Sequence, residues 1–267
     1  MPRRYKIDVS VDMGESFGHW NLGRPELDGE IMSHVTSCNV ACGFHAGDPH
    51  VMRKTVQLAK KKGVRVGAHP GLPDLVGFGR RRMDVAPEEL TDYIVYQAGA
   101  LKAMLAAEAA GELQHVLIHG IACLMSWYEE KYADAYIEAM AQLDPEKKLI
   151  MYGARGGPGP LYILDDLAKR AGQRRVAYAI ADMDYNVDGT LVMLREHPPV
   201  DVNYRVERVM KMIKEGVLLD VKRNPIPYSP QSLLVHSDTP NVVELLTAME
   251  QEFAREGIEK VPVSEIV

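Results

Sequence analysis

The sequence predicts an α/β fold in which seven parallel strands close into a TIM-like β/α barrel. Short apolar segments alternate with longer helical patterns roughly seven times along the chain, as in strands joined by right-handed helical crossovers. No linker, charge block or low-complexity segment divides the sequence. Since α/β barrels often reach 267 residues undivided, we expect one domain over residues 1–267. A doubly wound open sheet is the alternative architecture.

The first half of the chain is expected to supply four of the strands. Residues 7–12 alternate apolar and polar side chains, which is the periodicity of a half-buried strand. The stretch 37–49 begins as an apolar strand and breaks at Gly43 and Gly47. It ends at Asp48, which has the chemistry of a helix N-cap. The further strands are 64–69 and 115–120, and the helices are 25–34, 49–61, 87–110 and 121–143.

The second half of the chain continues this alternation. Strands are expected at 148–152, 175–182 and 232–236, and helices at 161–171, 204–215 and 241–255. Asp188-Gly189 marks a turn between short extended pieces over 185–192. The glycine-rich run 153–160 lacks the Lys-Ser/Thr ending of a P-loop, so we exclude nucleotide binding on that ground.

Composition and charge narrow the classes of function. A formal net charge of −6 and a pI near 5.9 give no electrostatic basis for binding nucleic acid or an anionic membrane. No apolar stretch has the length of a signal peptide or a membrane span. Cys38, Cys42 and Cys123 make a poor disulfide framework and are expected to be buried thiols. We therefore expect a cytoplasmic protein that acts on a small molecule, with a homo-oligomer left open.

Titratable side chains follow the carboxyl ends of six expected strands. They are Asp12, His45, His69, His119, Asp182 and His236. The carboxyl ends of parallel strands share one face of a barrel, and barrel enzymes place their active sites there. Each of these residues, taken singly, could simply hydrogen-bond the backbone of its own loop. Their coincidence on six strands predicts an active site at this face.

Two kinds of chemistry suit such a group. Neutral imidazole and carboxylate both bind divalent metals, so Asp12, His45 and His69 could form a metal site. The same side chains could act without metal as general acids and bases, because histidine titrates near neutral pH. The sequence does not choose between them, and we favour metal-free use. In the long loop after the third strand, a guanidinium of Arg80, Arg81 or Arg82 could hold a substrate carboxylate or phosphate, or the three could form a solvated charged surface.

Several blocks of the sequence resemble the LamB/YcsF family of lactam utilization proteins, which includes the A subunit of bacterial 5-oxoprolinase. The first half carries DMGESFG (12–18), NVACGFHAGDP (39–49), GAHPG (67–71) and PDLVGFGRR (73–81), and the second half carries DGTLV (188–192) and HSDTP (236–240). The match is dense from about residue 6 to 120. This resemblance implies a seven-stranded β/α barrel of the glycoside hydrolase/deacetylase type.

The resemblance also implies ATP-dependent opening of a cyclic amide, 5-oxoproline, to glutamate. Partner subunits of the B and C type would use ATP to phosphorylate the lactam oxygen, and the barrel subunit would then hydrolyse the activated ring. The candidates for catalysis are Asp12, His45, His69, His119 and Asp182. The candidates for substrate binding are Glu15, Asn39, Arg80, Arg81 and His236.

The chain departs from the family pattern at positions that would affect which substrate it binds. Leu117 and Ile118 stand where the family has Lys-Pro. Tyr178 takes the place of a Glu, and Met183 that of an Arg. The loss of two cations favours a less anionic substrate than 5-oxoproline, and the loss of the Glu offsets this in part. Two alternatives stay open, a stand-alone metal-dependent deacetylase or amidohydrolase and a non-catalytic binding subunit.

Overall fold

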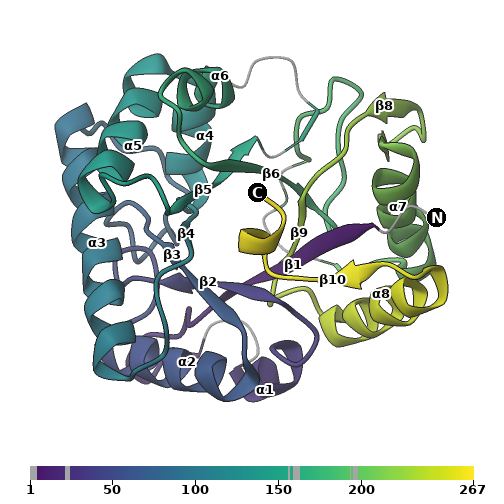
Figure 1. Cartoon of the computed structure of the whole chain (residues 1–267), viewed down its shortest axis with the longest axis horizontal. Coiled ribbons are helices and arrows are strands. Elements are labelled where there is room, and N and C mark those ends of the chain that lie inside the picture. The colour runs from purple at the N-terminus through teal and green to yellow at the C-terminus, as the bar shows by residue number, and fades with distance from the viewer. Residues whose placement is uncertain (1–4, 22–24, 156, 159–162, 193, 195–197) are drawn as a thin grey trace.

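The computed structural model describes residues 5–21, 25–155, 157–158, 163–192, 194 and 198–267. Within these residues, seven parallel strands close into a barrel surrounded by helices, as the sequence predicted (Figure 1). The barrel strands are β1 (Lys6–Met13), β2 (Ser37–Ala41), β3 (Arg65–His69), β4 (His115–Val116), β5 (Ile150–Arg155), β6 (Arg175–Ile180) and β9 (Ser232–Val235). Each strand pairs with the next in this order, and β9 pairs with β1 to complete the circle.

The register of the barrel brings the ends of neighbouring strands to one level. Asp12 lies opposite Asn39 across β1 and β2, and Ala41 lies opposite His69 across β2 and β3. Because these strands are all parallel, their carboxyl ends open at the same mouth of the barrel. The side chains at the ends of β1, β2, β3 and β4, or just beyond them, therefore converge there.

Helices cover the outside of the barrel (Figure 1). The longer ones are α2 (Pro49–Lys62), α3 (Pro87–Ala107), α4 (Gly120–Tyr128), α5 (Glu130–Leu143), α6 (Ile163–Arg170), α7 (Val202–Glu215) and α8 (Val242–Glu256). The predicted start of α2 is confirmed, since the Asp48 carboxylate accepts the backbone N–H groups of His50 and Val51. None of the helices in the described part of the chain is both long and apolar enough to cross a bilayer.

Two expected helices differ from the prediction. The helix expected over 121–143 is broken into α4 and α5 because the backbone of Glu129 is extended, with φ −127° and ψ 114°. The Glu129 carboxylate there pairs with Arg82 at 2.8 Å. The helix expected over 25–34 is a 3-10 turn, η1 (Pro25–Leu27), followed by the single turn α1 (Asp28–Ile31).

Other boundaries also differ in detail. The strand expected over 115–120 pairs only at His115 and Val116, so the chain leaves the sheet before it reaches His119. The extended pieces over 185–192 form one isolated bridge, between Tyr185 and Leu191. Residues 161 and 162 of the helix expected over 161–171, and residues 156, 159 and 160 of the glycine run, lie outside the described residues.

Three short strands near the end of the chain were not predicted. β7 (Val217–Leu219) and β8 (Pro225–Pro227) form an antiparallel hairpin. β10 (Glu259–Lys260) pairs in parallel with the first residues of β1 and leads into the 3-10 turn η2 (Val263–Glu265). The chain therefore ends over the amino-terminal mouth of the barrel, where its last segment lies near the centre of Figure 1.

Buried polar side chains occupy the barrel interior near this closed end. The Asp8 carboxylate accepts hydrogen bonds from Ser37 at 2.6 Å, Ser232 at 2.5 Å and Tyr152 at 2.9 Å. The Tyr152 hydroxyl also contacts Ser10 at 2.8 Å. All of these groups are buried, and mutual hydrogen bonding offsets their loss of water. The interior is thus a connected polar network and not only an apolar core.

Candidate active site

Three imidazole rings meet at the carboxyl-terminal mouth of the barrel. His45, His69 and His119 lie at or just after the ends of β2, β3 and β4, as the sequence predicted. The rings of His45 and His119 are stacked, with centroids 3.8 Å apart, and His69 meets His119 edge-on at 4.8 Å. Gly79 makes room for the stack, because a Cβ at that position would lie 2.7 Å from the Cβ of His45.

The hydrogen bonds of His69 and His119 fix where their protons lie. His69 Nδ1 is 2.7 Å from the carbonyl oxygen of Leu117, and His119 Nε2 is 2.8 Å from that of Phe78. A carbonyl oxygen only accepts, so both of these ring nitrogens carry the proton. The remaining nitrogens, His69 Nε2 and His119 Nδ1, face each other at 2.9 Å. Two neutral rings would place two lone pairs there, so this contact needs one more proton or a bound cation.

The surroundings decide where that positive charge lies. Burial, and then the charge of His69, hold the pKa of His119 well below its ordinary value. His69 instead has an anionic neighbour, since its Nε2 is 3.6 Å from Oδ2 of Asp12. The positive charge that this contact needs is therefore balanced by the Asp12 carboxylate, which lies on the His69 side of the pair.

His45 is buried and lacks hydrogen-bond partners. Neither ring nitrogen has one among the residues that the structure describes, and Oε1 of Glu15 is 4.0 Å from its Nε2. Burial, followed by the charges of His119 and His69, holds the pKa of His45 well below its ordinary value, so the ring is neutral. A neutral imidazole with a free nitrogen is a metal ligand.

Four residues could hold a divalent metal. Ligand atoms of Glu15, His45, His69 and His119 all lie within 4.8 Å of one another. The sequence-based trio included Asp12 with His45 and His69. The cluster contains His45 and His69 of that trio together with Glu15 and His119, and Asp12 stands beside it, with Oδ2 3.6 Å from Nε2 of His69.

Asp12 lies at the end of β1, and its two oxygens have different surroundings. Oδ1 accepts a hydrogen bond of 2.8 Å from Nδ2 of Asn39, whereas Oδ2 faces the cavity side near His69. Asn39 itself is buried and contacts His115 with its carbonyl oxygen. Asn39, a candidate for substrate binding, is not among the residues that line the cavity, and its amide holds Asp12.

An ion pair forms the opposite side of the site. His236 Nδ1 is 3.0 Å from Oδ2 of Asp182, which also accepts a hydrogen bond of 2.6 Å from Thr239. Burial would raise the pKa of Asp182, but the His236 charge and the hydrogen bonds from His236 and Thr239 together lower the pKa to about 2. Burial would likewise lower the pKa of His236, yet the charge and hydrogen bond of Asp182, with the charges of Asp12 and Asp238, raise it to about 9. Asp182 therefore orients a charged His236, and only His236 lines the cavity.

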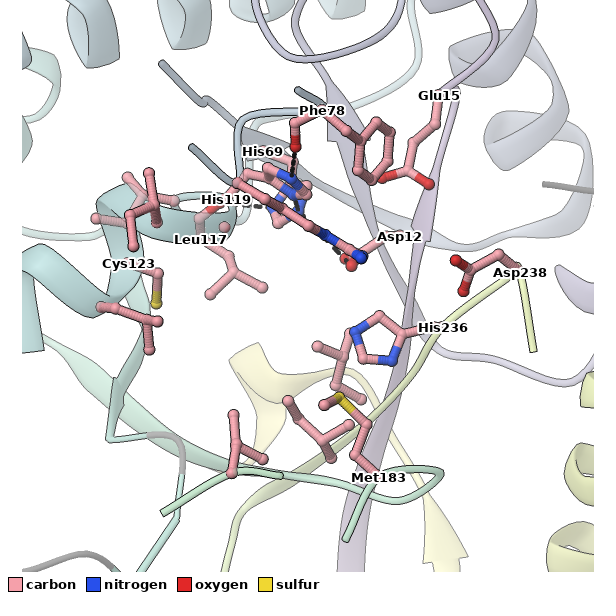
Figure 2. Close-up of a pocket in the computed structure, with 18 of the residues that line it drawn as sticks. Asp12, Glu15, His69, Phe78, Leu117, His119, Cys123, Met183, His236 and Asp238 are labelled. Atoms are coloured by element: carbon pink, nitrogen blue, oxygen red, sulfur yellow. Dashed lines mark hydrogen bonds and ion pairs between the residues drawn. The ribbon is translucent and has the colours of Figure 1, made fainter. Parts of the chain in front are cut away.

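The cavity enclosed by these groups measures about 130 Å³ and has two unlike sides (Figure 2). Its polar side carries Asp12, Glu15, His69, His119, His236 and Asp238. Burial, and then the charges of Asp12 and Asp238, raise the pKa of Glu15 to about 8, so this carboxyl group is protonated at neutral pH. The apolar side includes Phe78, Leu117, Ile118, Cys123, Trp127, Tyr178 and Met183.

The two predicted arginines are separated by the structure. Arg80 lines the cavity, with its guanidinium 5.2 Å from the ring centroid of Phe78. Arg81 points elsewhere and is exposed, and it forms an ion pair with the buried carboxylate of Asp74. Of the two arginines predicted to contact the substrate, only Arg80 is therefore placed to do so.

Sequence reasoning missed some residues of the cavity. Asp238 stands in the HSDTP block but was not singled out, although its position two residues after His236 was a usable signal. Phe78 gave no signal for its second contribution, a backbone carbonyl that accepts from His119 in a left-handed conformation, φ 54°.

Comparison with known proteins shows the family of this chain and agrees with its fold. The pattern that defines the LamB/YcsF family matches residues 7–267. The chain belongs to the LamB/YcsF family. It is 43% identical over 265 residues to the 5-oxoprolinase A subunit of Pyrococcus furiosus, covering 98% of this chain and 99% of that one. It is 39% identical over 264 residues to the 5-oxoprolinase A subunit of Bacillus subtilis, covering 98% of each.

A solved structure of the same family has the same fold. The lactam utilization protein of Thermus thermophilus superposes with a TM-score of 0.84 at 35% identity, covering 96% of this chain and 99% of that one. The family thus includes relatives of essentially the same length, and the β/α barrel is common to the chain and this relative.

Proposed function

We propose that this chain is the hydrolytic subunit of an ATP-dependent lactamase of the 5-oxoprolinase type, which adds water across the C–N bond of a cyclic amide. The names of its family relatives support this class of reaction. The observation that carries the proposal is the polar side of the cavity. There a carboxylate with one free oxygen, an imidazole pair that holds a positive charge and a protonated carboxyl group surround the same small space.

Each of these groups suits one part of amide hydrolysis. Oδ2 of Asp12 accepts a proton from the attacking water as its oxygen bonds to the carbonyl carbon. The positive charge on the His69–His119 pair stabilises the negative charge on the phosphorylated oxygen of the activated lactam as water adds to its carbon. Glu15, with a pKa of about 8, donates its proton to the nitrogen that leaves as the C–N bond breaks.

The proposal includes partner subunits and ATP. An unstrained lactam is a poor electrophile, and phosphorylation of its oxygen by an ATP-using partner would make its carbon reactive. After water has added and the C–N bond has broken, the product is an acyl phosphate, which a second water hydrolyses to the carboxylic acid and inorganic phosphate. The relatives that are named as A subunits support an assembly with B-type and C-type subunits. The three cysteines Cys38, Cys42 and Cys123 are free and buried, which supports our placing this assembly in a reducing cytoplasm.

We further propose that the substrate is less anionic than 5-oxoproline. Leu117, Tyr178 and Met183, where the chain departs from the family pattern, all line the cavity and belong to its apolar side. Among the lining residues that the structure describes, Arg80 is the one lysine or arginine. A neutral lactam with apolar substituents would bury more surface against this side than a carboxylate-bearing one.

The experiment combines the purified chain with the subunits encoded beside its gene, ATP and a panel of lactams. We expect ring opening that requires ATP and all subunits, with neutral lactams turned over faster than 5-oxoproline. Formation of ADP without release of an amino acid from any lactam would contradict the proposal. That outcome would favour a non-catalytic binding subunit.

One observation favours a second function, that of a stand-alone metal-dependent amidohydrolase. The buried, unpartnered His45 fits a metal bound by Glu15, His45, His69 and His119. A divalent metal bound there would polarise a carbonyl and acidify water. Metal analysis of the purified chain and hydrolysis of amides without ATP or partners test this alternative, and activity that survives chelation excludes it.

A further inference from the structure

A line of hydrogen bonds runs through the barrel from the carboxyl-terminal segment to Asp12. Ser264, in η2, contacts Oε1 of Gln114 at 2.9 Å. Gln114 Nε2 is 3.0 Å from Nδ1 of His115, and His115 Nε2 is 2.7 Å from Oδ1 of Asn39. Asn39 Nδ2 then reaches Oδ1 of Asp12 at 2.8 Å. The line joins the closed end of the barrel to the floor of the cavity.

The carboxylate of Asp12 sets the direction of every hydrogen bond in this line. A carboxylate oxygen only accepts, so the amide NH₂ of Asn39 faces it and the carbonyl of Asn39 faces His115. His115 must then donate from Nε2. Its Nδ1 therefore accepts from the NH₂ of Gln114, whose carbonyl accepts from the Ser264 hydroxyl. Each group donates toward Asp12, and no amide or ring can be reversed without losing two bonds.

The interior is built to hold His115 in this position. The side chain is completely buried and its ring lies against that of Tyr152, with centroids 4.6 Å apart. A Cβ at Gly67, on the neighbouring strand, would lie 1.9 Å from His115 Nε2, so only glycine leaves space for the ring. Burial, and then the charge of His69, lower the pKa of His115 to about 3, so the ring stays neutral and keeps one tautomer at neutral pH.

We propose that His115 and Asn39 are positioning residues that hold the Asp12 carboxylate, with Gln114 and Ser264 anchoring them to the carboxyl-terminal segment. With Oδ1 of Asp12 held by Asn39, Oδ2 is the oxygen left for the reaction. His115 does not line the cavity, so it acts through Asn39. The catalytic consequence rests on the function proposed above, in which Asp12 accepts the proton from water.

The test compares His115→Phe, which cannot donate to Asn39, with His115→Gln, whose amide can. The first readout is the ¹³Cγ resonance of Asp12 in the chain alone, which reports the hydrogen bonding of its carboxylate without any turnover. We expect it to shift in His115→Phe and to return toward the wild-type position in His115→Gln. Thr91→Val serves as a control, because it removes buried hydrogen bonds to Pro87 and Ala135 far from the line.

The second readout is lactam turnover in the complete assembly with ATP. We expect His115→Phe to lower kcat by about tenfold to a hundredfold with little change in KM, since a displaced catalytic group affects chemistry more than binding. His115→Gln should recover most of this loss. If the role of His115 were merely structural, Thr91→Val would lose activity as well, and His115→Phe and His115→Gln would have equal activities.

The two readouts separate this inference from the proposed function. An unshifted Asp12 resonance in folded His115→Phe overturns the inference, whatever the activity. A shifted resonance together with a wild-type chain that opens no lactam supports the positioning role and overturns the proposed function. If His115→Phe does not fold, His115→Asn replaces it in the test, because its shorter amide does not reach Asn39. The ¹³Cγ resonance of Asp12 is then compared between His115→Asn and the wild type.

Discussion

His69 and His119 face each other through ring nitrogens that are 2.9 Å apart, while each donates its other N–H to a backbone carbonyl. The backbone thus fixes both tautomers and leaves a gap that one positive charge must fill. Asp12, 3.6 Å from His69, supplies the countercharge. The site is arranged around this charge whether a proton or a metal provides it.

His45 gives a prediction about stability. With chelator present, His45→Leu should raise the free energy of unfolding by about 1 kcal/mol, because it removes a buried polar ring that has no hydrogen-bond partner in the described structure. Urea unfolding measures this. If the wild type binds zinc at the cluster, added zinc should raise its Tm and leave that of His45→Leu unchanged. His50→Ala, on the exposed start of α2, controls for incidental zinc binding, and an equal rise in all three proteins would contradict a site at His45.

The Asp182–His236 pair predicts how stability depends on pH. The pKa of His236 is raised from 6.5 to about 9, so its contribution is complete below pH 6.5 and is lost as the pH rises through about 9. The pKa of Asp182 is lowered from 3.8 to about 2, so its contribution to stability is complete above pH 3.8 and is lost as the pH falls through about 2. Asp182→Asn should lower the free energy of unfolding at pH 6 by about 3 kcal/mol.

Urea unfolding between pH 5 and 10 checks this behaviour. Asp182→Asn should also flatten the decline in stability between pH 6.5 and 9, because His236 then loses its anionic partner. Asp188→Asn, which changes an exposed carboxylate, is the matched control. A decline of equal slope in the wild type and Asp182→Asn would show that the pair is not the cause.

The apolar side of the cavity gives a prediction about substrate. Leu117→Lys places an ammonium among the lining residues, so it should lower KM for 5-oxoproline about tenfold relative to a neutral lactam, a difference of about 1.4 kcal/mol. Leu117→Met keeps the wall apolar and should leave the ratio unchanged. The measurement is KM for both lactams in the complete assembly. An unchanged ratio in Leu117→Lys would mean that this wall does not contact the part of the substrate that carries charge.

Gly67 gives a prediction about the barrel interior. Gly67→Ala should lower the free energy of unfolding by about 3 kcal/mol, since its Cβ would overlap the ring of His115. The double variant with His115→Ala should lose less than the sum of the two single variants, because the smaller side chain leaves room. Gly99→Ala, where a Cβ meets nothing within 4 Å, should be neutral or stabilising. Simple additivity in the double variant would contradict the contact.

The barrel and its polar mouth could be predicted because both follow from the repeated alternation of strands and helices along the chain. Strand periodicity, glycine breaks and the Asp48 cap are local signals, and parallel strands bring the residues that follow them to one face. Chain order alone therefore placed Asp12, His69 and His119 together.

What could not be predicted depends on where side chains point. Arg80 and Arg81 are adjacent, yet one lines the cavity and the other pairs with Asp74. His115 begins a strand that was predicted, but its ring fits into the barrel only because Gly67, on a different strand, has no side chain. The broken helix at Glu129 likewise depends on the backbone of one residue. No local pattern carries this information.

The most direct test of the account is the yield of ring opening per ATP in Asp12→Asn. Asparagine keeps the oxygen that accepts from Asn39 and loses the base, so we expect ADP to form while amino acid release falls about a hundredfold or more. Wild-type protein in the same assembly should release close to one amino acid per ADP. Equal yields from wild type and Asp12→Asn would contradict the claim that this cavity opens the lactam.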